Sequence, residues 1–366
     1  MQELYQKYKL FFIILGLAFT GFLVWYFSEI VIFIVVAVVV SIIGSPMVEL
    51  LDRIRFRKLK FPHILSVIIT LLLMVVLFFG LISFFIPLIV KEANMISNID
   101  GKALMDYYKY EIAWTQDFLL RYGIMPKGAT IDSSLKDFAL KLVDFGLFSN
   151  ILSKIISFAG TFLFSVFSIL FLSLFFLYDN RMMPRLILLV VPQKYEEQTR
   201  NVMTKSRKLL SRYFIGLIIQ VLLNILTYSL ALIIVGAKGA LVIAFFAGII
   251  IVIPYLGGII AIITGILLGV TGVISMGDYA HIVSMALKIF IAMLAVQLID
   301  NNVFQPYIQG KVVQAHPVEI FLLILAAASI GGIPAMIIAI PAYGFLKIVA
   351  VEFLSQFRLI QKISEK

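Results

Sequence analysis

The stretch IVIPYLGGII, residues 251–260, interrupts an apolar run that extends from residue 240 to residue 274. A single helix of that length would measure about 50 Å, whereas the hydrocarbon core of a bilayer is roughly 30 Å thick. Proline removes a helical hydrogen-bond donor, and glycine lets the chain reverse. The interruption therefore predicts a helical hairpin, and its irregular tip must face buried protein or a cavity that water reaches.

The composition predicts a membrane protein. Of the 366 residues, 62% are hydrophobic and 14% are charged, whereas soluble domains average about 45–50% apolar and 25% charged residues. Six apolar segments are expected to cross the membrane: 10–27, 30–44, 62–90, 151–178, 213–235 and 282–304. We expect an all-α, polytopic integral membrane protein with about six spanning helices and two broken re-entrant hairpins.

The second hairpin is predicted from residues 317–350. Each run has 14 residues before its interruption and 16 after it, and the second interruption is Gly331-Gly332-Ile333-Pro334. Neither half is long enough to cross a bilayer comfortably. An alternative stays open, in which each run is kinked but still crosses.

The charge distribution predicts which side of the membrane each loop occupies. The net charge is +10, and the basic residues cluster beside hydrophobic segments, as the positive-inside rule expects. The N-terminus, the basic stretch 179–212 and the C-terminus are therefore expected in the cytoplasm, and the polar segment 91–150 outside it. Because the charge follows the membrane segments, nucleic-acid binding is not expected.

Five regions follow from this layout. They are the first three membrane helices as a scaffold (1–90), a small helical extracytoplasmic insert (91–150), the fourth helix with its basic segment (151–212), a core (213–350) and a cytoplasmic tail (351–366).

The core contains an internal repeat with an offset of 77 residues. Gln220 matches Gln297 and Asn224 matches Asn301, while Pro254 falls on Gly331. Each unit is a helix with a polar stripe followed by a broken hairpin, and the two units would have inverted topology. Inverted repeats with matching Gly/Pro interruptions indicate the binding site of a secondary transporter.

The candidate solute-binding residues are those of the two tips and the two stripes. They are Pro254, Tyr255, Gly257, Gly258, Gly331, Gly332, Pro334, Gln220, Asn224, Gln297, Asn301 and Gln305. Interhelical hydrogen bonding would explain Gln220 and Asn224 equally well, and Tyr255 could be a packing residue.

Two carboxylates are candidates for coupling transport to H+ or Na+. Asp300 lies near the end of an apolar helix, where an acidic residue usually marks a pathway or a proton relay. The alternative places Asp300 at the membrane interface, where it caps and solvates the helix end. Glu319 lies in the first turn of the second hairpin, where a helix-dipole role is the alternative.

The sequence contains no motif of a known enzyme class. It has no H-E-x-x-H, no G-x-S-x-G, no P-loop and no cysteine, and its three histidines show no metal-site spacing. We therefore expect no enzyme activity, no cofactor and no metal. Active transport would be driven by a gradient.

Residues 300–347, DNNVFQPYIQGKVVQAHPVEIFLLILAAASIGGIPAMIIAIPAYGFLK, resemble the C-terminal signature of the AI-2E family, the autoinducer-2 exporters. IPYLGG, residues 253–258, resembles the family's other hallmark. The resemblance implies a bacterial inner-membrane protein that exports autoinducer-2, a small polyhydroxylated molecule. It also implies a homo-pentamer, two hairpins around the substrate site and an elevator-like movement.

The resulting hypothesis is a gradient-driven secondary transporter that exports autoinducer-2 or a similar polar solute. Three alternatives remain: a sodium(lithium)/proton antiporter, a non-transporting membrane scaffold and a passive pore. The expected partners are the solute, H+ or Na+, the lipid bilayer and further copies of the chain.

Overall fold

The structure is a computed structural model. It describes residues 15–97, 145–308 and 316–354, apart from residues 17, 20, 24, 57, 58 and 255, together with residues 107, 109 and 121. The predicted insert lies largely outside the described residues, as do the tail from residue 355 and the predicted site residue Tyr255.

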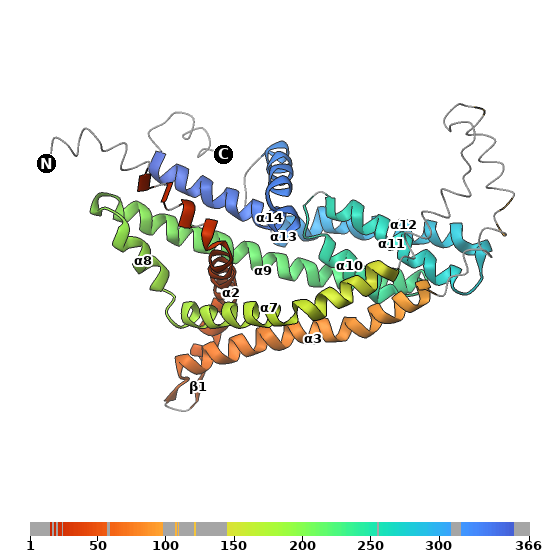
Figure 1. Ribbon diagram of the computed structural model, residues 1–366, viewed down its shortest axis with the longest axis horizontal. Helices are drawn as coiled ribbons and strands as arrows, with labels where there is room; N and C mark the ends of the chain where they lie inside the picture. Colours follow the sequence, from red (N-terminus) through yellow and green to blue (C-terminus); the bar gives the residue numbers. More distant parts are fainter. Residues whose placement is uncertain are drawn as a thin grey trace. The chain divides into compact units, whose positions relative to one another are not determined.

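The described part of the chain is almost entirely helical (Figure 1). Its α-helices are α2 (Ser28–Asp52), α3 (His63–Ser97), α7 (Phe145–Tyr178), α8 (Met182–Val190), α9 (Glu196–Ile234), α10 (Ala240–Ile250), α11 (Leu256–Ile274), α12 (Ile282–Ile299), α13 (Gln305–Ile308) and α14 (Pro317–Leu354). Within the described ranges, the strands are β1 (Arg55–Phe56) and β2 (Leu59–Lys60), which pair antiparallel. The all-α prediction is confirmed.

Six described helices are long and apolar enough to cross a membrane. They are Ser28–Asp52, His63–Glu92, Gln193–Ile234, Leu256–Ile274, Tyr279–Ile308 and Val318–Phe353. The polytopic prediction is confirmed, although these six helices are not the same six segments that the sequence predicted to cross the membrane. The predicted first segment, 10–27, is described only in part, and two runs predicted as hairpin components are long enough to be included.

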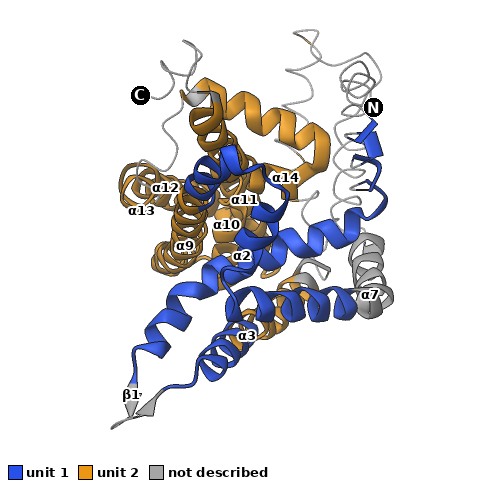
Figure 2. Ribbon diagram, turned by 90° about the vertical axis from the view of Figure 1, so that its left-hand side faces the viewer, with its two compact units in different colours: residues 1–75, 157–203 blue, residues 76–156, 204–366 orange. Residues whose placement is uncertain are grey.

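The chain forms two compact units (Figure 2). Unit 1 comprises residues 1–75 and 157–203, and unit 2 comprises residues 76–156 and 204–366. The division falls inside α3 and α9, so each of these long helices contributes one part to each unit. The predicted domain boundaries, which lie elsewhere, stay predictions.

In unit 1, a glycine lets three helices approach closely. A Cβ atom at Gly44 of α2 would lie 3.3 Å from side-chain atoms of Thr70 in α3 and of Leu177 in α7. Small residues allow this close packing inside a membrane, where apolar surface alone does not drive helices together. His63 joins the ends of the same helices, because its ring nitrogens contact Asp52 Oδ2 at 2.8 Å and the Tyr178 carbonyl at 3.1 Å.

In unit 2, α10 and α11 form the first predicted hairpin. A Cβ atom at Gly257 would overlap the backbone of Ile250, one at Gly265 would lie 3.2 Å from Ile243, and one at Gly272 would meet Lys238. As the residue numbers of the glycines increase along α11, the residue numbers of their partners decrease, so the two helices run antiparallel. The helices have 11 and 19 residues rather than the predicted 14 and 16.

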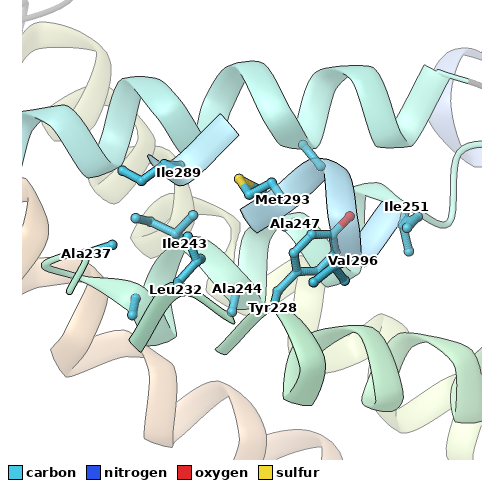
Figure 3. Close-up of a cluster of buried hydrophobic side chains, with 12 residues drawn as sticks. Tyr228, Leu232, Ala237, Ile243, Ala244, Ala247, Ile251, Ile289, Met293 and Val296 are labelled. Carbon is cyan, nitrogen blue, oxygen red and sulfur yellow. The ribbon is translucent and has the colours of Figure 1, made fainter. Parts of the chain in front are cut away.

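The core of unit 2 packs around this hairpin (Figure 3). The buried cluster draws Tyr228 and Leu232 from α9, Ile243, Ala244 and Ala247 from α10, Ala261 from α11, and Ile289, Met293 and Val296 from α12. The hairpin is therefore held between the two helices that carry the predicted polar stripes.

The second predicted hairpin lies within α14. Its backbone is not helical at Gly331 or at Gly332, where φ is +61° and ψ is −147°. A side chain rarely adopts that conformation, so glycine is favoured there. The Tyr343 hydroxyl donates to Glu319 Oε2 at 3.0 Å, although the two residues would be about 36 Å apart in a straight helix. The chain must therefore reverse at the two glycines.

Candidate functional site

A short π-helical segment positions the polar stripe of the second repeat. It spans Asp300–Phe304, between α12 and α13. A π turn inserts extra backbone into the helix and is frequent at functional sites. From the sequence we expected one continuous helix here, because no residue type or spacing in this stretch distinguishes a π turn from an α-helical turn.

Asp300 is fully buried, with 0% of its surface exposed. Gln220 Nε2 donates to both carboxylate oxygens, at 2.9 and 3.1 Å, and Asn224 Nδ2 donates to Oδ1 at 2.6 Å. No ion pair joins Asp300 to a basic residue in the described part of the chain. The burial of Asp300 argues against the part of the alternative in which water solvates it.

Oxygen atoms around Asp300 could hold a small cation or accept a hydrogen bond from a donor. A buried charge without a counter-charge is unfavourable, and amide dipoles compensate it only in part. Asn224 Oδ1 is also buried and accepts no hydrogen bond from the described residues. Such an oxygen could accept a hydrogen bond from a protonated carboxyl group or contribute a ligand to a cation.

A second polar layer connects the two stripes. The Tyr228 hydroxyl donates to Gln297 Oε1 at 3.0 Å, and Gln297 Nε2 donates to Asn301 Oδ1 at 3.2 Å. The polar residues matched by the repeat thus lie in neighbouring layers on α9, on α12 and on the π-helical segment that follows α12. Sequence reasoning missed Tyr228, although it continues the spacing of Gln220 and Asn224 by another four residues.

A cavity of about 410 Å³ lies beside these layers. Its lining residues are Tyr213, Leu217, Ile251, Val252, Ile253, Pro254, Gly258, Gln297, Asn301, Gln305, Ile320 and Ile340. Ligand sites commonly measure about 300–1,000 Å³, so this cavity suits a small molecule. The lining joins the first hairpin tip, the polar stripe and both arms of the second hairpin.

The first tip reaches the stripe because it contains glycine. A Cβ atom at Gly258 would overlap the side-chain amide of Gln297. Gly257 has a different place, because it packs against the backbone of Ile250 and closes the hairpin.

The structure brings five of the predicted binding residues to the cavity: Pro254, Gly258, Gln297, Asn301 and Gln305. Asp300, Gln220 and Asn224 form the buried layer described above, outside the lining. The predicted residues of the second tip, Gly331, Gly332 and Pro334, are exposed and do not line the cavity. The expectation that both tips face a cavity therefore holds for the first tip alone.

Glu319 is exposed and accepts the hydrogen bond from Tyr343. It lies in the first helical turn of α14 and does not line the cavity. The geometry favours a role in holding the two arms of the hairpin together. No group of three or more potential metal ligands occurs among the residues that the structure describes.

Comparison with known proteins identifies similar chains. A family model described as "AI-2E family transporter" matches residues 10–355. The chain is 26% identical to "Putative transport protein YueF" of Bacillus subtilis (strain 168) over 338 residues, which cover 89% of this chain and 84% of that protein. It is also 26% identical to "Putative transport protein YrrI" of the same organism over 184 residues, half of each chain.

Proposed function

The chain belongs to the AI-2E family of transporters, and from this membership we propose that it is a secondary transporter of a small polar solute. The observation that carries the proposal is the cavity beside Gly258, with the buried Asp300 layer adjacent to it. The protein would act as a transporter and not as an enzyme, in a bacterial cytoplasmic membrane.

The lining favours a neutral, hydroxylated solute. Gln297, Asn301 and Gln305 offer amide groups that both donate and accept hydrogen bonds. The remaining lining residues are mostly aliphatic, and none of them is charged. A polyhydroxylated molecule of the autoinducer-2 class fits this chemistry, because its hydroxyl groups can pair with the amides while its carbon skeleton contacts isoleucine side chains.

Asp300 would couple transport to an ion gradient. Binding of a proton or Na+ at the carboxylate would weaken the hydrogen bonds that it accepts from the Gln220 and Asn224 amides, so those side chains could reorient. Asp300 adjoins Asn301 in the chain, and Asn301 lines the cavity. Occupancy of the ion site would therefore alter the solute site.

The two stripe-and-hairpin repeats would move together in an elevator-like cycle. In support, their residues belong to one compact unit, and the second hairpin contributes Ile320 and Ile340 to the same cavity as the first tip. A homo-pentameric assembly completes the proposal and rests on the family resemblance.

The alternative function is sodium(lithium)/proton antiport. It is favoured by Asn224, whose amide nitrogen contacts the Asp300 carboxylate and whose buried oxygen has no hydrogen-bond partner among the described residues, because a cation could bind there without any solute. A non-transporting scaffold would need neither the cavity nor the buried carboxylate.

Reconstituted vesicles test the proposal. Purified protein in proteoliposomes is loaded with autoinducer-2, and efflux is followed under imposed proton or sodium gradients. Saturable, gradient-dependent efflux supports the solute transporter. Proton movement in response to sodium or lithium, without solute efflux, supports the antiporter. If a folded protein showed neither solute efflux nor cation-driven proton movement, both proposals would be contradicted.

A further inference from the structure

Helix α8 leaves the direction of the preceding helix almost at a right angle. The helical segments Phe162–Tyr178 and Met182–Val190 are bent by 85° across three intervening residues (Figure 1). Spanning helices are tilted on average by about 20° from the bilayer normal. If α7 crosses at such a tilt, α8 lies close to the plane of the membrane surface and within a few ångströms of it.

One face of α8 is apolar and exposed. Met182, Leu186, Leu189 and Val190 are spaced i, i+4, i+7 and i+8, which places them on one side of a helix. Their exposed fractions are 38%, 49%, 82% and 86%. We call these four residues the α8 stripe. No residue of α8 is buried.

Basic residues flank the α8 stripe. Arg181 precedes the helix, Arg185 lies within it and Lys194 follows it, and all three are exposed. The one acidic residue between positions 179 and 194 is Asp179, which pairs with Arg185 at 3.2 Å on the surface. The segment therefore carries a net charge of +2 from three basic residues and one acidic residue.

We propose that α8 is an interfacial helix whose stripe enters the headgroup–acyl boundary and whose basic residues bind the phosphates of anionic lipids. An apolar face with a basic edge is typical of helices that lie in this boundary. The long basic side chains can extend along the helix and place their charges at the phosphates. Lipid is the proposed partner because α8 is separated by only three residues from the apolar segment Phe162–Tyr178, and the two segments together are long and apolar enough to cross a membrane. This surface is separate from the transport site and does not depend on the solute.

The first experiment measures the depth of the α8 stripe in a membrane. The chain contains no cysteine, so Leu189→Cys and Val190→Cys each introduce one spin label in vesicles of phosphatidylglycerol and phosphatidylcholine. We expect greater collision with oxygen than with a water-soluble nickel chelate. Gln193→Cys, an exposed site beyond the helix, is the control and should show the reverse.

Two results would overturn the proposal. Greater collision with the nickel chelate at both stripe positions would mean that the stripe faces water. Protection from both reagents would mean that a protein segment covers it.

The second experiment tests the lipid class. A fluorophore at Val190→Cys is quenched by brominated phosphatidylglycerol or by brominated phosphatidylcholine in mixed vesicles. We expect at least about twofold stronger quenching by the anionic lipid, because each basic residue near an anionic surface favours binding on the order of fivefold. The triple variant R181Q/R185Q/K194Q should lose that preference, whereas R185K alone should retain it. Equal quenching by the two lipids in the unaltered chain, or a preference that survives in the triple variant, would overturn the assignment to anionic lipid.

Discussion

Ile253, in the tip of the first hairpin, packs against Ile324, in the first arm of the second hairpin, and both side chains are buried. Met336, from the second arm, joins the same cluster. Ile253 also lines the cavity. The position of the first tip, and with it the shape of the cavity, therefore depends on how the second hairpin is folded.

Replacing Asp300 by asparagine should abolish gradient-driven flux while the protein remains folded. Asparagine has nearly the same shape, but it cannot carry the charge that exchanges a proton or a cation. Flux in vesicles and thermal unfolding would be measured together. Asp278→Asn is the matched control, because Asp278 is an exposed loop residue. Normal flux through Asp300→Asn would remove this residue from the mechanism.

Gly258→Ala should impair solute transport. The added methyl group would overlap the Gln297 amide, so either the tip or the amide must move at the wall of the cavity. We expect KM to rise at least about tenfold, which corresponds to 1.4 kcal/mol. Gly80→Ala is the control, because a Cβ atom at Gly80 meets nothing within 4 Å. If the two substitutions changed KM equally, the cavity would not be the site that binds the transported solute.

The fold of the second hairpin can be measured by the distance between two spin labels. Leu322→Cys and Ala342→Cys are exposed positions on opposite sides of the break, and a straight helix would separate them by about 30 Å. We expect a clearly shorter distance. Labels at Thr204→Cys and Leu226→Cys on the unbroken α9 should give about 33 Å. A distance near 30 Å for the first pair would mean a continuous spanning helix.

The topology of the first hairpin can be tested by thiol labelling. If α9 runs outward and the hairpin returns to the same side, the loop that contains Asp278 lies outside the cell. An impermeant reagent should then label Asp278→Cys in intact cells. Gln193→Cys, on the basic side, should react only after the membrane is opened. Labelling of Asp278→Cys from the cytoplasm alone would show that α10 and α11 together cross the membrane.

Gly239→Ala should destabilise the protein more than Gly277→Ala does. Both glycines have positive φ, +69° and +71°, so each substitution introduces backbone strain of about 1–2 kcal/mol. Only at Gly239 would the new Cβ atom also overlap a side chain, the buried carboxyl group of Glu92 in α3. Thermal unfolding of the two variants isolates that contact. Equal losses of stability would mean that Glu92 moves aside freely.

Some of this architecture follows from local chemistry alone. The breaks at Pro254 and at Gly331-Gly332 could be predicted, because a missing amide hydrogen or a missing Cβ atom acts on the chain wherever it is placed. The stripe of Gln297, Asn301 and Gln305 could be predicted from its four-residue spacing, and all three residues line the cavity.

Other features depend on which segments meet. Glu92 was assigned to the polar insert because charged residues surround it in the sequence, yet α3 continues past it and buries it against Gly239. The exposure of the second tip and the two amide partners of Asp300 likewise follow from packing between segments far apart in the chain.

The sequence by itself determined that this chain is a helical membrane protein, where its helices break and where its polar stripes lie. Only the tertiary structure decided which aliphatic residues form the cavity wall. Ile320 lines the cavity and Leu322 is exposed, although both are apolar residues of the same helix. The reason is that lipid and protein interior are equally apolar in a bilayer, so hydrophobicity does not distinguish a residue that faces the cavity from one that faces lipid.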